Sequence, residues 1–231
     1  MSFVLVHGAG MGASCWEPLL PLLEGDTLAI DLPGRGGRRS VDPRSVTLDD
    51  CAAAVIDDVE AANLGDVVLV AHSFAGVTAP RVMQALAHRL RHVVFLSAVV
   101  PPDGTRVIDQ IDPDVRAAVE ASIEDGAYRQ DPMGAAAMLC NDMDAEQTEW
   151  MIAQLVDDCG ALLTESVDLS GLRADIPRTY VRLSKDTCYP PELQERSAVL
   201  VGGDTAFLES GHMAMVTMPD RVAALLNGVA P

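Results

Sequence analysis

Short runs of apolar residues alternate with longer segments of helical character along most of the chain, and this alternation limits the possible folds. The runs are continuous in Val, Leu and Ile, which is typical of strands buried on both faces. Helices between such strands favour a parallel sheet, because each crossover covers a face of it. We therefore expect an α/β fold with a mainly parallel, twisted sheet and helices on both faces. The expected strands cover residues 3–6, 27–31, 66–72, 92–100, 179–186 and 205–210.

The segments between these runs carry helix signals. Residues 47–65 begin with Thr47 as a plausible N-cap and have Asp50 at the capping-box position, and Gly65 stands where a C-cap is expected. Helical spacing also covers residues 15–23, despite their prolines. Further helices are expected across 77–90 and 220–229.

One interval, residues 101–175, departs from this alternation because it contains no strand-like run. It is helical in character and too long for a loop. We expect a single domain over residues 1–231, with 101–175 inserted as a small helical cap. Trp150 and several methionines of the cap are candidates for the wall of a ligand pocket, although core packing explains such methionines as well.

Composition excludes several classes of partner. The formal net charge is -18, and so acidic a surface disfavours binding to nucleic acid or anionic membranes. The five cysteines are widely spaced without a CxxC pair, so neither a disulfide framework nor a metal site is predicted. The N-terminus lacks the pattern of a signal peptide, and no apolar run reaches membrane-spanning length. These features predict a cytoplasmic protein with no metal.

The stretch "LVAHSFAG" at residues 69–76 places Ser73 between an expected strand and an expected helix. A nucleophile elbow needs a tight strand-to-helix turn with small flanking residues, and Ala71, Ala75 and Gly76 supply them. The motif alone is also compatible with a serine that caps the following helix. Ser73 is therefore a candidate nucleophile whose role depends on the rest of the chain.

A serine nucleophile needs a base and an acid, which in an α/β-hydrolase follow in the order Ser, acid, His. Among the histidines, only His212 has the required position, whereas His88 and His92 flank a helix end and are expected to face solvent. Asp186 ends an expected strand, at the edge of the sheet where active sites collect. The rival acid, Asp204, precedes its strand instead. We therefore favour Asp186 as the acid.

The glycine-rich turn "HGAG" at residues 7–10 follows the first expected strand. A turn there can direct backbone N–H groups toward the nucleophile, which predicts an oxyanion hole made by the N–H groups of Ala9 and Phe74. The competing interpretation is a dinucleotide-binding loop with Asp31 on the ribose. The glycine spacing does not fit that motif, and this alternative ranks lower.

Together, these motifs resemble the α/β-hydrolases, in particular the small branch that contains plant methylesterases and hydroxynitrile lyases. The matching stretches are "FVLVHGAGMGASCW", "VLVAHSFAG", "SKDTCYPPELQ" and "SGHMAM", in the order of that branch. The resemblance implies the α/β-hydrolase fold, a catalytic triad of Ser73, Asp186 and His212, and no cofactor. The lyases carry threonine at the position of Gly8 and lysine at that of Met213, so this chain is more similar to the esterases.

The resemblance therefore predicts a serine hydrolase for a small, largely apolar ester, such as a methyl or aryl ester or a lactone. The candidate pocket residues are Trp150, Met213 and His7. Non-hydrolytic enzymes of this fold, lyases or cyclases that use the triad for proton transfer, remain an alternative, as does a ligand-binding receptor with residual activity. The sequence leaves the assembly state open, with a homodimer among the alternatives.

Overall fold

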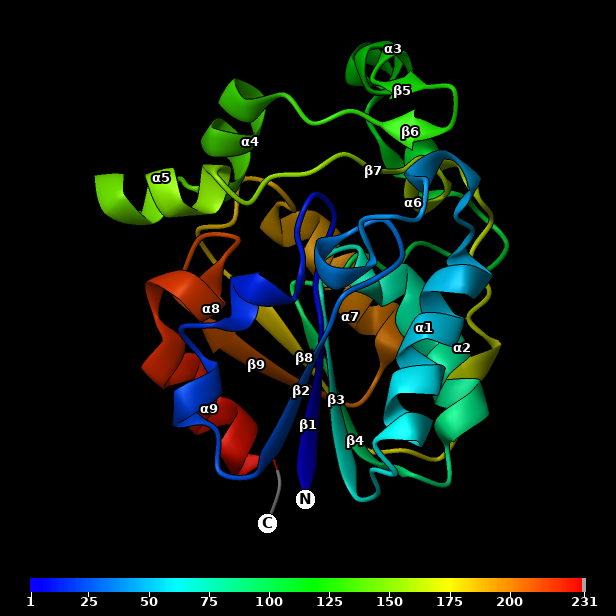
Figure 1. Cartoon of the computed structure of the whole chain (residues 1–231), viewed down its shortest axis with the longest axis vertical. Coiled ribbons are helices and arrows are strands. Elements are labelled where there is room, and N and C mark those ends of the chain that lie inside the picture. The colour runs from blue at the N-terminus through cyan, green and yellow to red at the C-terminus, as the bar shows by residue number, and fades with distance from the viewer. Residues whose placement is uncertain (230–231) are drawn as a thin grey trace.

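A computed structural model describes residues 1–229 and contains a central sheet of six strands in the order β2-β1-β3-β4-β8-β9 (Figure 1). All neighbouring strands in this sheet are parallel, which confirms the fold class predicted from the alternation of apolar runs and helices. The strands are β1 (Ser2–Val6), β2 (Asp26–Ile30), β3 (Val67–His72), β4 (Leu90–Leu96), β8 (Arg178–Leu183) and β9 (Asp204–Leu208).

The sheet separates two apolar layers, because successive side chains along a strand point to opposite faces. In β1, Val4 and Val6 pack into one layer while Phe3 and Leu5 pack into the other. Helices α1 and α2 cover the first face, and α8 and α9 cover the second (Figure 1). None of the helices within residues 1–229 is both long and apolar enough to span a membrane. The covering helices are α1 (Leu48–Ala61), α2 (Ala75–Leu86), α7 (Pro191–Val201), α8 (Ala214–Thr217) and α9 (Pro219–Gly228).

Helix α1 begins as its sequence predicts and ends earlier. The Thr47 hydroxyl accepts a hydrogen bond from the Asp50 N–H at 3.1 Å, and the Asp50 carboxylate accepts one from the Thr47 N–H at 2.9 Å. This reciprocal capping box satisfies two N–H groups at the helix start. The predicted C-cap at Gly65 is wrong: the cap is Ala62, and Asn63 takes the left-handed backbone with φ 49°.

The helix expected across residues 15–23 does not form. Two short 3-10 helices stand in its place, η1 (Ala13–Trp16) and η2 (Leu20–Leu22). Pro18 and Pro21 lack the N–H that an α-helix requires and disfavour helical backbone in the residues before them. The apolar spacing of this segment therefore serves packing against β1 rather than one continuous helix.

Strand β4 ends earlier than predicted, and its histidine is not where we expected it. The strand stops at Leu96 because Ser97 adopts a left-handed backbone with φ 41°. His92 was expected to face solvent but is buried, and its Nε2 lies 2.9 Å from the Thr179 hydroxyl on the neighbouring strand. A neutral imidazole with a hydrogen-bond partner is readily accommodated inside a sheet.

The segment between β4 and β8 lies over the carboxyl ends of the sheet strands (Figure 1). Helices cover about half of it, and it also contains a three-stranded antiparallel sheet that we did not predict. Each of these strands has two residues, too few to show an apolar pattern. The elements are η5 (Val107–Gln110), α3 (Pro113–Ala121), β5 (Ile123–Glu124), β6 (Ala127–Tyr128), α4 (Pro132–Leu139), α5 (Ala145–Ile152), β7 (Asp158–Cys159), α6 (Ala161–Thr164) and η6 (Ser170–Arg173).

We predict that Gly76→Ala lowers the free energy of unfolding by about 1–3 kcal/mol, because overpacking strains the surrounding backbone. A Cβ at Gly76 would lie 2.4 Å from the Val99 carbonyl oxygen, a backbone atom that cannot rotate away. Gly65→Ala is the matched control, since a Cβ there meets nothing within 4 Å. Urea denaturation of both variants measures the difference. Equal stability of Gly76→Ala and the wild type would contradict the prediction.

Candidate active site

Ser73 occupies a strained turn between β3 and α2. Its φ of 54° places a non-glycine residue in the left-handed region, which is uncommon and costs free energy. The turn is held by backbone hydrogen bonds: the Ser73 carbonyl accepts from Gly76 N–H at 3.0 Å and from Val99 N–H at 2.8 Å. Helix α2 has Phe74 as its N-cap and receives no side-chain cap. The interpretation of Ser73 as a helix cap is therefore wrong, and its hydroxyl is directed elsewhere.

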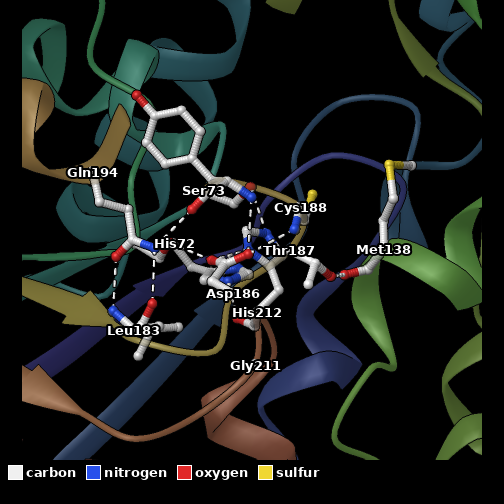
Figure 2. A network of polar contacts seen from close by, with 12 residues as sticks. His72, Ser73, Met138, Leu183, Asp186, Thr187, Cys188, Gln194, Gly211 and His212 are labelled. Atoms are coloured by element: carbon white, nitrogen blue, oxygen red, sulfur yellow. Dashed lines mark hydrogen bonds and ion pairs between the residues drawn. The ribbon is translucent and has the colours of Figure 1, made fainter. Parts of the chain in front are cut away.

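The Ser73 hydroxyl meets His212 and, through it, Asp186 (Figure 2). Ser73 Oγ lies 2.9 Å from His212 Nε2, and His212 Nδ1 lies 2.7 Å from Asp186 Oδ2. Ser73, Asp186 and His212 follow β3, β8 and β9, respectively. Because these strands are parallel, all three residues lie at the same end of the sheet, beyond the carboxyl ends of the strands. The rival acid, Asp204, is the first residue of β9. It therefore lies at the opposite end of the strands, and it is exposed. The chain order used in the sequence analysis thus corresponds to a hydrogen-bonded Ser–His–Asp arrangement.

Asp186 is buried but receives several hydrogen bonds. The Ser97 hydroxyl donates to its Oδ2 at 2.6 Å, and the backbone N–H groups of Cys188 and Tyr189 donate to its Oδ1 at 2.9 and 2.8 Å. Burial by itself raises the pKa of the carboxyl, but the charge of His212 and these hydrogen bonds outweigh it and lower the pKa below its ordinary value. Asp186 therefore stays ionised and can orient His212.

His212 and His72 differ in their readiness to accept a proton. Burial opposes a charge on His212, but the nearby Cys188 sulfur and the Asp186 carboxylate outweigh this and hold its pKa well above 6.5. Burial and the neighbouring His212 lower the pKa of His72 to about 3. Neutral His72 donates from Nε2 to the His212 carbonyl at 3.0 Å. This hydrogen bond supports the backbone of the loop that carries His212. Of the two, only His212 suits a general base.

The turn after β1 brings Gly8 and Ala9 against the serine. A Cβ at Gly8 would lie 2.6 Å from Ser73 Cβ and 3.1 Å from Ser73 Oγ, so this position has no room for a side chain. Within residues 1–229, the backbone N–H groups of Ala9 and Phe74 donate to no protein acceptor, and both residues line the cavity beside Ser73. Two free donors next to the Ser73 hydroxyl fit the oxyanion hole that the sequence predicts.

The segment over the sheet holds this turn through Gly10. The Gly10 N–H donates to Asp158 Oδ2 at 2.7 Å, and its carbonyl accepts from Val156 N–H at 3.0 Å. Arg35 forms an ion pair with Asp158, and neither side chain has any exposed area. The ion pair neutralises a carboxylate that would otherwise be costly to bury. Ala9 therefore lies between Gly10, which these hydrogen bonds hold in place, and the two residues that connect it to the end of β1.

Two further residues of the same segment hold the other loops of the site. The Asn141 side chain donates to the Lys185 carbonyl at 2.8 Å, next to Asp186. Asp142 accepts from the Gly211 N–H at 2.6 Å, next to His212. The turn at residues 7–10 and the loops that carry Asp186 and His212 are thus each bound to the covering segment by a side chain. Residues 141, 142 and 158 were not among our sequence candidates, since contacts over such distances leave no local pattern.

A small cavity of about 40 Å³ opens beside Ser73 and His212. Met213 lines it, as we proposed for the pocket, but Trp150 and His7 do not. Trp150 packs instead against the apolar layer formed by η1, α8 and α9. His7 is fully buried, donates to the Gly8 carbonyl at 2.8 Å and accepts from Leu32 N–H at 3.2 Å. The cavity is lined by Gly8, Ala9, Met11, His72, Ser73, Phe74, Tyr128, Gln130, Ala135, Met138, Leu139, Cys188, His212 and Met213.

The structure also decides against the dinucleotide alternative. Asp31, the supposed ribose ligand, accepts from Ala13 N–H at 2.7 Å and from Gly37 N–H at 2.8 Å, so both of its oxygens are engaged. The Gly10 N–H, which a phosphate would need, is bound to Asp158. Among the described residues, no three His, Cys, Asp or Glu side chains converge as a metal site requires.

Comparison with known proteins gives a family for this architecture. A family model described as "Alpha/beta hydrolase family" matches residues 3–225. The norfluorocurarine synthase 1 of a Strychnos species is 27% identical, with 99% of this chain and 94% of the relative aligned. The polyneuridine aldehyde esterase of Rauvolfia serpentina is 25% identical over 99% of this chain and 95% of the relative. The similar proteins thus include one named as a synthase and one named as an esterase.

Solved structures with low sequence identity share the fold. An extracellular α/β-hydrolase from a Paenibacillus species aligns with a TM-score of 0.90 at 23% identity, covering 100% of this chain and 99% of the other. The crystal structure of polyneuridine aldehyde esterase aligns with a TM-score of 0.79 at 21% identity, with the same coverage. At this level of identity the alignments establish the fold.

We predict that Arg35→Met lowers the free energy of unfolding by about 3–5 kcal/mol, because it leaves the Asp158 carboxylate buried without its cation. The matched control is Arg44→Met, which removes an arginine from the solvent-exposed ion pair with Asp42. Denaturation curves of both variants give the comparison, and the control should keep the wild-type midpoint. A small and equal effect of the two substitutions would contradict the prediction.

Proposed function

The chain belongs to the alpha/beta hydrolase family, and we propose that it hydrolyses carboxylic esters through an acyl-enzyme formed on Ser73. The observation that carries this proposal is the continuous hydrogen-bonded path from Ser73 Oγ through His212 to Asp186, which faces a cavity. The relative named as an esterase agrees with this class of reaction.

In the proposed acylation, the Ser73 oxygen attacks the ester carbonyl while its proton passes to His212 Nε2. The new bond joins Oγ to the carbonyl carbon, whose oxygen becomes negatively charged. As the carbonyl re-forms, the bond to the alcohol oxygen breaks, and His212 gives its proton to that oxygen. A water molecule then repeats the sequence on the acyl-enzyme, with His212 as base, and releases the acid and free Ser73.

The remaining groups stabilise charge in this sequence. The N–H groups of Ala9 and Phe74 are proposed to bind the oxyanion, since both are free and line the cavity. Asp186 keeps the His212 proton on Nδ1 and stabilises the imidazolium that forms. No step of this mechanism calls for a metal or an organic cofactor.

The cavity wall supports a small, largely apolar substrate, such as a methyl or aryl ester. Apart from Ser73 and the two histidines, most of the lining residues are apolar, among them Met11, Met138 and Leu139. No charged Asp, Glu, Lys or Arg side chain is among the residues that line it. A cytoplasmic location and a homodimeric state remain predictions from the sequence.

A non-hydrolytic reaction is the second candidate, because one relative over nearly the whole chain is named as a synthase. The same triad could then transfer protons without forming an acyl-enzyme. The crowding at Gly8 argues against a lyase that needs threonine there, since a Cβ would press on Ser73. Ester turnover that depends on Ser73 distinguishes the two candidates.

We predict that Ser73→Ala and His212→Ala each lower kcat for ester hydrolysis on the order of 10⁴-fold or more. A panel of methyl, aryl and 4-nitrophenyl esters supplies the substrates, because the acyl and alcohol groups are not known. The matched control is Ser40→Ala, which removes a hydroxyl from an exposed residue outside the site and should keep wild-type rates. Hydrolysis that persists in Ser73→Ala would rule out the proposed nucleophile.

We also predict that kcat/KM falls as the pH is lowered, with a midpoint above 6.5. Protonated His212 cannot accept the Ser73 proton, and its pKa is raised, so activity is present above that pKa and lost below it.

Asp186→Asn should move this midpoint to lower pH, because the carboxylate that raises the His212 pKa is gone, and kcat should fall about 10⁴-fold. Asp204→Asn, a change at the rival acid, should leave the profile as it is. A profile whose midpoint moves in Asp204→Asn and not in Asp186→Asn would contradict our assignment of the acid.

A further inference from the structure

The cavity beside Ser73 contains a polar group that the proposed mechanism does not use. Gln130 follows β6 and lines the cavity, and its Nε2 is buried without a hydrogen-bond partner. A buried amide donor that bonds to nothing costs free energy, and such a group in a native structure calls for an explanation. An explanation at a cavity wall is a hydrogen bond to the bound substrate.

Gln130 lies beside the turn at residues 7–10, which carries the proposed oxyanion donor Ala9. This position limits where a hydrogen bond from Gln130 to a substrate can form. A Cβ at Gly10 would lie 3.1 Å from Gln130 Cδ, so the amide rests against the residue next to Ala9. The Gln130 N–H donates to Asp157 Oδ1 at 3.1 Å, one residue before the Asp158 that holds Gly10. The amide and the proposed oxyanion hole are therefore parts of one connected structure and line the same cavity as Ser73.

Tyr128 supplies a second polar group on the same wall. It stands two residues before Gln130 and also lines the cavity. Its hydroxyl bonds to no protein group among the described residues, and burial raises its pKa above 10, so the phenol stays protonated. A phenol that keeps its proton and an amide N–H can both donate to an oxygen.

The residues that line the cavity limit which kind of substrate oxygen can bind to Gln130 and Tyr128. Because no charged arginine or lysine lines the cavity, a carboxylate or phosphate on the substrate would be buried without a counter-charge. A ketone, aldehyde or ether oxygen accepts a hydrogen bond at much lower cost of desolvation.

We propose that Gln130 and Tyr128 form a polar subsite for a neutral acceptor oxygen that the substrate carries near its ester carbonyl. This inference rests on the proposed function and narrows its substrate to oxygen-bearing esters. Gln130 acts here as a specificity-determining residue, since it binds the substrate without taking part in proton transfer.

Two matched pairs of neutral esters test the subsite. Methyl 3-oxopentanoate is compared with methyl pentanoate for an oxygen in the acyl part, and 2-oxopropyl pentanoate with propyl pentanoate for one in the alcohol part. The wild type should favour the oxo ester in at least one pair by about 10-fold to 100-fold in kcat/KM, the effect of a hydrogen bond to a buried donor. Gln130→Leu should bring that ratio close to one.

Gln110→Leu is the matched control, because it makes the same change at an exposed residue outside the cavity and should keep the wild-type ratio. Met138→Leu changes the shape of the cavity wall but not its polarity, so it should also keep the ratio. A wild type without preference in either pair, or a preference that survives in Gln130→Leu, would overturn the subsite.

A binding measurement separates this inference from the proposed function. Calorimetric titration of Ser73→Ala with both pairs should show the same preference in Kd, and Gln130→Leu in that background should lose it. If the wild type hydrolyses no ester, the proposed function fails, while the ratio of Kd values still decides the subsite. If Ser73-dependent hydrolysis occurs without any preference in rate or binding, the subsite fails and the proposed function stands.

Discussion

The left-handed backbone of Ser73 is the constraint on which the rest of the site depends. It costs free energy and persists because the hydrogen bonds of the Ser73 carbonyl with Gly76 and Val99 hold it. The same turn directs Oγ toward His212 and leaves the Phe74 N–H free. It also requires close approach from neighbouring chain, which explains why positions 8 and 76 are glycine.

The segment over the sheet does more than close the cavity. Asn141, Asp142 and Asp158 bind, respectively, the loop of the proposed acid, the loop of the proposed base and the turn at residues 7–10 with the proposed oxyanion donor. A hydroxyl nucleophile, a base and two backbone donors must keep their relative positions to within a fraction of an ångström. Because of these contacts, the loops that carry Asp186, His212 and Ala9 are all attached to the same segment, the one between β4 and β8. Substitutions in this segment can therefore change catalysis as well as substrate choice.

Much of this arrangement can be predicted from the sequence, and the rest has identifiable reasons for escaping prediction. The sheet strands are predictable because they are continuous apolar runs. Since the strands are parallel, their carboxyl ends lie together, and this explains why the chain order predicts the contact of Ser73, Asp186 and His212. Ser97, which donates to Asp186, comes directly after β4 and was not among our sequence candidates. The two-residue strands and the Arg35–Asp158 pair depend on distant contacts and leave no periodic pattern. Trp150 was a pocket candidate by residue type, but its helix turns it toward the core.

The most direct test of this account is a crystal structure of the protein after reaction with a serine-reactive phosphonate ester. The phosphorus should be bonded to Ser73 Oγ, since this hydroxyl is the proposed nucleophile and lies 2.9 Å from His212 Nε2. One phosphoryl oxygen should lie about 2.7–3.1 Å from both the Ala9 and the Phe74 nitrogen, the geometry of an oxyanion hole. A folded protein that carries no label on Ser73, or an adduct whose oxygen points away from both nitrogens, would contradict the account.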